Sequence, residues 1–171
     1  METRTEPQLA RQPVRRSLRE GDPEGIIDLH RRVYVPEFGR GPGFLAGVAS
    51  GIRTTVAAGW PSAGGGVWLI DGAGQLSGSL GLTQEGDGVG RVRWFVLDRS
   101  LRGQGWGGWL LAELLGQARA EGLHRLELET FSALTTAAHL YRRAGFRLIW
   151  ERVRHDWGPP VTYQGYQLDL G

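Results

Sequence analysis

The chain changes from strand to helix across one run of residues: Trp94-Phe95-Val96-Leu97-Asp98-Arg99-Ser100-Leu101-Arg102-Gly103-Gln104-Gly105-Trp106-Gly107-Gly108. Its first residues are apolar, which is typical of a strand, and an amphipathic helix follows its last glycines. Glycines let consecutive backbone N–H groups approach an anion, and the unpaired N–H groups and dipole of a helix N-terminus favour phosphate there. The run therefore predicts a pyrophosphate site, with an unliganded glycine-rich turn as the alternative.

The flanking patterns predict one α+β domain with a mixed, mostly antiparallel sheet of about seven strands. The expected strands are 14–18, 67–70, 75–83, 89–97, 124–129, 146–154 and 162–170, and the expected helices are 23–34, 44–56, 105–121 and 134–144. Asp22 before Pro23 predicts the N-cap of the first helix. Short turns make the middle three strands antiparallel neighbours, and the later strand-helix alternation predicts a central parallel pair.

Length and composition limit the class of protein. The 171 residues suffice for one domain, and 40% apolar with 22% charged residues is ordinary globular usage. We expect a flexible tail at 1–12 before a single domain at 13–171. Cysteine is absent, which excludes disulfide scaffolds and thiolate zinc sites, and the composition fits the cytoplasm.

Charge and hydropathy exclude several kinds of partner. The 20 positive charges are all arginine and nearly balance 18 acidic residues, and the arginine pairs are scattered, so we expect no nucleic acid. No apolar run approaches the ~20 residues of a membrane span, so we expect no membrane contact. The four histidines lack metal-ligand spacing, so we expect no metal.

A dinucleotide-binding fold is a rival interpretation of the glycine run. Gly103, Gly105 and Gly108 satisfy G-x-G-x-x-G, and Glu127 or Glu129 follows about 20 residues later. The glycines nevertheless lie several residues beyond the strand, and the preceding strands are joined by hairpin-length turns. Too little chain remains for a doubly wound parallel sheet. A P-loop is excluded because the chain contains no lysine.

Two landmarks in order resemble the GNAT superfamily of acyl-CoA-dependent N-acyltransferases. The first is Arg102-Gly103-Gln104-Gly105-Trp106-Gly107, which is similar to the family's Q/R-x-x-G-x-G/A signature. The second is Leu140-Tyr141-Arg142-Arg143-Ala144-Gly145-Phe146, which resembles the tyrosine-bearing helix that ends in Gly-Phe. The resemblance spans about Val14 to Leu170, and the expected order of elements is also the family's order.

The resemblance implies how each landmark acts. The backbone amides of Arg102, Gly103, Gln104, Gly105, Trp106 and Gly107 should bind the pyrophosphate of acetyl-CoA, and the strand Phe95, Val96 and Leu97 should pair with its pantetheine. Tyr141 should act as the general acid that protonates the departing thiolate. Reference pKa values near ~8.5 for a thiol and ~10 for a phenol make that transfer uphill by only ~2 kcal/mol.

The base is less defined than the acid. Glu129 stands where some family members carry a glutamate base, and strand alternation places Glu127 on the same side. Glu85 and catalysis without a base also remain open, since holding amine and thioester together gives effective molarities of ~10⁵ M or more. Leu134 replaces an asparagine of many relatives that binds pantetheine, and Ser132 or Thr135 is an alternative donor.

The resemblance therefore implies an acetyl-CoA-dependent N-acetyltransferase in which a primary amine attacks the thioester directly. The acceptor, a small-molecule amine or a peptide, is left open, as are an acyl group longer than acetyl and a homodimer. Two other functions remain as alternatives. One is a coenzyme A or acyl-CoA sensor without turnover, and the other is the dinucleotide-binding oxidoreductase.

Overall fold

The computed structural model describes residues 14–155 and 159–171, so the tail predicted at 1–12 lies outside the described residues. The elements in chain order are β1 Val14–Arg15, α1 Asp22–Phe38, α2 Pro42–Ala57, β2 Gly66–Asp71, β3 Leu76–Gly86, β4 Val89–Leu97, the 3-10 helix η1 Arg99–Leu101, α3 Trp106–Ala120, β5 Arg125–Phe131, α4 Thr135–Arg143, β6 Arg147–Arg154 and β7 Val161–Asp169. This order and the α+β fold confirm the prediction.

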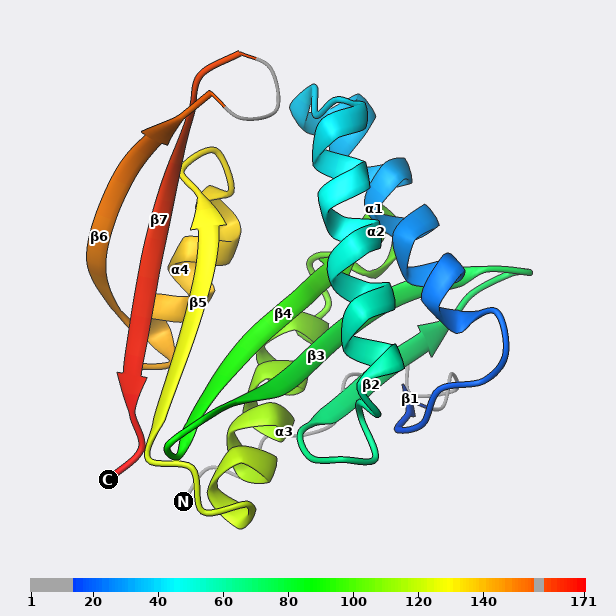
Figure 1. Ribbon diagram of the computed structural model, residues 1–171. Coiled ribbons are helices and arrows are strands. Elements are labelled where there is room, and N and C mark those ends of the chain that lie inside the picture. The colour runs from blue at the N-terminus through cyan, green and yellow to red at the C-terminus, as the bar shows by residue number, and fades with distance from the viewer. Residues whose placement is uncertain (1–13, 156–158) are drawn as a thin grey trace.

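The described strands form one sheet in the order β1-β2-β3-β4-β5-β7-β6 (Figure 1). Neighbouring strands are antiparallel except β4 and β5, which form the expected central parallel pair. A doubly wound parallel sheet is therefore excluded, and the dinucleotide-binding interpretation is wrong. Within the described ranges, no helix is both long and apolar enough to span a bilayer.

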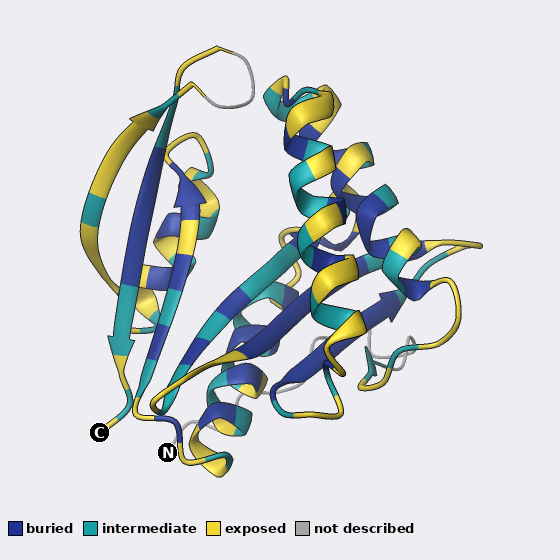
Figure 2. Ribbon diagram, viewed as in Figure 1, coloured by how far each residue is buried: buried dark blue, intermediate teal, exposed yellow. Residues whose placement is uncertain are grey.

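Helices cover both faces of the sheet. Figure 2 shows that the strands in the middle of the sheet and the helix residues that face them are buried. One core packs α3 and α4 against the sheet and includes Trp106, Leu110, Leu126 and Tyr141. Two smaller cores pack α1 and α2 against the opposite face. Alternate residues of β2 enter opposite cores, Trp68 and Ile70 on one face and Val67 and Leu69 on the other, because successive side chains of a strand point to opposite faces.

The N-terminal region differs from the prediction in three places. The strand expected at 14–18 is shorter, because only Val14–Arg15 pairs with β2. Asp22 does not cap α1: Gly21 is the N-cap in a left-handed conformation, and the Asp22 carboxylate binds Arg15 and the Arg19 N–H. The helix also continues past Pro36 to Phe38. A proline near a helix end removes one hydrogen bond, and the helix then ends at Gly39, whose N–H donates to the Val35 carbonyl.

Arg15 ties β1 to the start of α1 and to β2. Its guanidinium lies 2.8 Å from Asp22 and 2.7 Å from Asp71, and the Arg15 and Asp22 side chains are each 10% exposed. Burial raises the pKa of the Asp22 carboxyl, but hydrogen bonds from Arg15 and the Arg19 N–H outweigh burial and lower it overall. The same guanidinium lowers the pKa of Asp71.

Replacing Arg15 by glutamine should lower the free energy of unfolding by about 2–3 kcal/mol at pH 7, because it leaves the Asp22 carboxylate buried without its cation. The folded-state pKa of Asp22 lies below its unfolded value, so its contribution is present above pH ~4 and is lost as pH falls further. Urea denaturation should therefore show that the difference in free energy of unfolding between wild type and Arg15→Gln becomes smaller below pH ~4.

The control is Arg53→Gln, which removes an exposed pair with Glu24 and should change the free energy of unfolding by about 0.5 kcal/mol or less. Equal effects of the two substitutions at pH 7, or a difference that grows in acid, would contradict this account of the Arg15 cluster.

Candidate active site

A bulge in β4 opens the centre of the sheet. Ser79 pairs with Val96 and Gly81 pairs with Arg93, so Trp94 and Phe95 together oppose a single residue of β3. Trp94 adopts φ 50, a left-handed conformation that is rare outside glycine, and its carbonyl accepts a hydrogen bond from Ser79 Oγ at 2.6 Å. Bulges bend the strand that carries them. The parallel ladder between β4 and β5 consequently contains only Val89–Arg91 paired with Arg125–Glu127.

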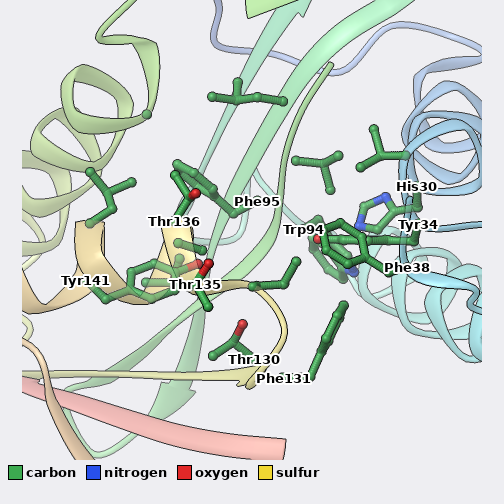
Figure 3. A pocket seen from close by; sticks show the side chains of 18 of the residues that line it. His30, Tyr34, Phe38, Trp94, Phe95, Thr130, Phe131, Thr135, Thr136 and Tyr141 are labelled. Atoms are coloured by element: carbon green, nitrogen blue, oxygen red, sulfur yellow. The ribbon is translucent and has the colours of Figure 1, made fainter. Parts of the chain in front are cut away.

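Beyond that short ladder, β4 and β5 diverge (Figure 1), and a cavity of ≈ 720 Å³ occupies the gap. Its lining comes from both faces of the sheet, with Tyr141 and Gly107 on the α3/α4 side and Tyr34 and Phe44 on the α1/α2 side. Figure 3 shows Tyr141 and Tyr34 at opposite ends of the labelled set. Two molecules entering from opposite faces would therefore meet beside β4.

The edge of β4 that faces this gap is free of strand pairing between Trp94 and Leu97 on the β5 side. Phe95, Val96 and Leu97 all line the cavity. A backbone edge without a neighbouring strand presents N–H and C=O groups to an extended ligand with amide groups of its own.

The glycine loop lies where β4 leads into α3. Gly103 and Gly105 adopt φ 73 and φ 87, which a side chain would strain. The Trp109 N–H donates to the Gly105 carbonyl in the first turn of α3, and the N–H groups of Trp106 and Gly107, which precede it, have no carbonyl of their own helix to bind. These amides form a helix N-terminus suited to an anion.

The structure places the predicted coenzyme-binding residues around one cavity with a single exception. Those that line it are Phe95, Val96, Leu97, Arg102, Gly103, Gly105, Trp106 and Gly107. Gln104 does not line it, and its side-chain amide instead donates to the Ser100 carbonyl at 2.9 Å. Thr135 and Thr136 line the cavity near the start of α4, whereas Ser132 does not, so Thr135 is the better placed of the two predicted substitutes for asparagine.

Two arginines attach the glycine loop to α1. Arg102 donates to the Leu97 carbonyl and lies 2.9 Å from Glu37, and Arg99 lies 3.1 Å from the same carboxylate. The Glu37 side chain is largely buried, and the hydrogen bond from Arg102 lowers its pKa despite that burial. Glu37 lies in the extra turn of α1 beyond Pro36, which explains why the sequence pattern did not indicate it.

Tyr141 lies on α4 and is buried, with its ring against Phe95, Phe146 and Tyr166. Its side chain lines the cavity, and no described residue is hydrogen-bonded to its hydroxyl. Burial raises the pKa of the phenol above its ordinary value. The hydroxyl is therefore protonated at neutral pH and can donate a hydrogen bond or a proton to a group in the cavity.

Only one of the three carboxylates that the sequence offered as a base lies at the cavity. Glu129 lines the cavity, with its carboxylate 3.6 Å from Arg154. Glu127 and Glu85 do not line it, and each lies 3.7 Å from Arg91. Leu126 and Leu128 enter the core under α3, so alternation places Glu129 on the α1/α2 face, opposite the face from which Tyr141 projects.

The α1/α2 end of the cavity has an aromatic wall that the sequence did not predict. We define the wall as Tyr34, Phe38, Phe44, Phe131 and Tyr163. Neighbouring rings meet at tilted or edge-on angles with centroids 5.3–6.5 Å apart. These residues come from α1, α2, β5 and β7, and each fits an ordinary core position, so no local signal separates them from the core.

His30 is a further buried residue at this end. Its Nδ1 lies 2.7 Å from the Ile26 carbonyl, and burial lowers its pKa to about 4. The ring is therefore neutral at physiological pH. Among the described residues, no group of three or more His, Asp or Glu side chains could hold a metal ion.

Comparison with known proteins agrees with this geometry. The profile of the acetyltransferase (GNAT) family matches residues 28–146, which is more than half of the chain. The chain belongs to the GNAT acetyltransferase family. Both landmarks, the glycine loop and the tyrosine helix, lie inside the matched range, so the resemblance found in the sequence is confirmed.

Solved structures of the family share the fold at low identity. A GNAT acetyltransferase from Staphylococcus aureus Mu50 is 18% identical with a TM-score of 0.73, covering 94% of this chain and 99% of its own. The ribosomal-protein-alanine N-acetyltransferase of Brucella melitensis is 16% identical with a TM-score of 0.67, covering 91% and 98%. A phosphinothricin acetyltransferase from Sinorhizobium meliloti, solved with acetyl-CoA, is 20% identical with a TM-score of 0.70, covering 94% and 89%.

Proposed function

We propose that this GNAT protein transfers the acetyl group of acetyl-CoA to a primary amine by direct attack of the amine on the thioester. One observation carries the proposal: a cavity crosses the sheet beside the unpaired edge of β4, with Tyr141 on one face and Glu129 on the other. Acetyl-CoA would enter from the α3/α4 face, and the amine from the α1/α2 face.

The residues present fit acetyl-CoA as a substrate. The N–H groups of Trp106 and Gly107, at the N-terminus of α3, suit a pyrophosphate. The free edge of β4 at Phe95, Val96 and Leu97 suits the amides of pantetheine, as an added strand would. The hydroxyls of Thr135 and Thr136 are further polar groups on the same side (Figure 3).

Each side chain then has one task as the bond to nitrogen forms and the carbon-sulfur bond breaks. Glu129 accepts the proton that the amine must lose, directly or through water. Tyr141 donates its proton to the sulfur. A β4 amide donates a hydrogen bond to the carbonyl oxygen as negative charge builds there, where such a bond strengthens in the transition state.

Burial of Tyr141 is compatible with its role as an acid. Desolvation disfavours the phenolate and raises the pKa of the phenol. A thiolate released into the same water-poor cavity is disfavoured for the same reason, so the pKa of the thiol rises as well. The difference between the two pKa values, and not either value alone, sets the free energy of the proton transfer.

The test is incubation of the purified protein with acetyl-CoA and a panel of primary amines, including amino acids, arylalkylamines and short peptides. Mass spectrometry should detect one added acetyl group on an amine, together with free coenzyme A in equal amount. Tight binding of acetyl-CoA without a product on any amine would favour the non-catalytic sensor.

A further inference from the structure

Arg93 is a second charged group at the acceptor end of the cavity. It precedes the β4 bulge, lines the cavity and is only partly exposed. Its guanidinium carbon lies 4.4 Å from the centre of the Trp94 ring, and one terminal nitrogen lies close to Gly51 of α2, 3.2 Å from where a Cβ would stand. The absence of a side chain at Gly51 leaves room for this guanidinium.

The guanidinium of Arg93 makes no hydrogen bond or ion pair with any residue in 14–155 or 159–171. The nearest carboxylates have other partners, because Glu85 lies beside Arg91 and Glu129 lies beside Arg154. Burial lowers the pKa of Arg93 overall, although the charge of Glu85 and, less strongly, that of Glu129 raise it; neighbouring Arg91 lowers it further.

Arg16 is a comparable arginine whose guanidinium does have a hydrogen-bond partner in the protein. It also stacks on a tryptophan, with its guanidinium carbon 4.2 Å from the centre of the Trp68 ring, and burial also lowers its pKa. Unlike Arg93, it donates to the Val67 carbonyl at 3.2 Å. A partly desolvated cation that donates no hydrogen bond to the protein has its donors available to an anion in the cavity.

Shape and spacing fit a carboxylate on the acceptor. A guanidinium presents a planar fork of donors that matches a carboxylate. Arg93 precedes Phe95 by two residues, at most about 7 Å along a strand, so a small molecule can place its carboxylate at Arg93 and its amine beside β4 together. The aromatic wall lies at the same end and offers apolar ring surface, while Arg40, which stacks on three of its rings, does not itself line the cavity.

We propose that the acceptor is an amino acid with an apolar, aromatic side chain: Arg93 binds its carboxylate and the aromatic wall receives its side chain. This inference rests on the proposed function and names the substrate class of that site. It also assigns Arg93 the role of a specificity-determining residue, which neither landmark of the family includes.

Calorimetry on the protein saturated with coenzyme A tests the inference with L-phenylalanine and phenethylamine, which differ by the carboxylate alone. Wild type should bind phenylalanine at least about tenfold more tightly, because a charge-assisted hydrogen bond contributes ~1.5–3 kcal/mol. Arg93→Gln should abolish the preference. Arg16→Gln is the matched control and should keep it.

Equal affinity of wild type for the two ligands would overturn the inference, as would an unchanged preference in Arg93→Gln or no binding of phenylalanine at millimolar concentration. The comparison of the two ligands on wild type needs no variant, so it tests the inference even if Arg93→Gln fails to fold. Measuring acetylation of the two ligands distinguishes a failure of this inference from a failure of the proposed function. Equal acetylation of both ligands overturns the inference alone, whereas selective binding without any acetylation overturns the proposed function alone.

Discussion

Replacing Tyr141 by phenylalanine is expected to lower kcat for acetyl transfer by about 10²–10³-fold, within the ~10²–10⁴-fold that a general acid contributes. The substitution keeps the ring and so retains its contacts with Phe95, Phe146 and Tyr166. No described residue loses a hydrogen-bond partner, because none binds the hydroxyl. The affinity for acetyl-CoA, measured by calorimetry, should therefore change little.

Tyr166→Phe is the matched control for this prediction. Tyr166 is also fully buried, its ring lies 6.0 Å from that of Tyr141, and its hydroxyl has no partner among the described residues. It does not line the cavity, so its substitution should leave kcat unchanged. The assignment of Tyr141 fails if Tyr141→Phe keeps kcat within about twofold of wild type, well short of a general acid's contribution, or if Tyr166→Phe loses as much.

Replacing Gly105 by valine is expected to weaken acetyl-CoA binding by about 100-fold, the equivalent of losing one or two charge-assisted hydrogen bonds. Gly105 is the N-cap of α3 and adopts φ 87, a conformation that a β-branched residue avoids. No atom lies within 4 Å of an added Cβ, so the fold can accommodate the side chain. The backbone must rotate, which turns the loop amides away from the pyrophosphate.

Gly122→Val supplies the control at the other end of the same helix. Gly122 follows α3, adopts φ 74 and has no atom within 4 Å of an added Cβ, but it does not line the cavity. Both variants should lose similar stability to heat, and only Gly105→Val should lose affinity for acetyl-CoA in calorimetry. Wild-type affinity in Gly105→Val, or an equal loss in Gly122→Val, would refute the role of the loop.

The glycine-loop and Tyr141 side of the cavity could be predicted from sequence because its signals are local. The glycine loop and the helix that carries Tyr141 are each continuous runs in which backbone conformation and chemistry follow from neighbouring residues. Strand alternation also predicted correctly that Glu127 and Glu129 share a face. The resemblance already pointed to Glu129, but that Glu129 lines the cavity and Glu127 does not depends on tertiary structure, namely on where β4 leaves β5 and on the pairing of Glu127 with Arg91.

The α1/α2 end of the cavity could not be predicted, for a physical reason. The aromatic wall joins residues from α1, α2, β5 and β7, and an isolated Phe or Tyr in each is indistinguishable from core packing. Arg93 stands out only in the tertiary structure, where its guanidinium lies beside Gly51 of α2 and stacks on Trp94 but has no hydrogen-bond or ion-pair partner among the described residues. Long-range packing of this kind leaves no periodic signature.

The most direct measurement is a titration of isotope-labelled protein with acetyl-CoA, followed through its backbone amide NMR signals. We predict saturable binding, with the largest shifts at Phe95, Val96 and Leu97 and across 102–107, and small shifts along β6. Absence of binding at millimolar acetyl-CoA, or shifts concentrated away from β4 and the start of α3, would contradict the proposed site.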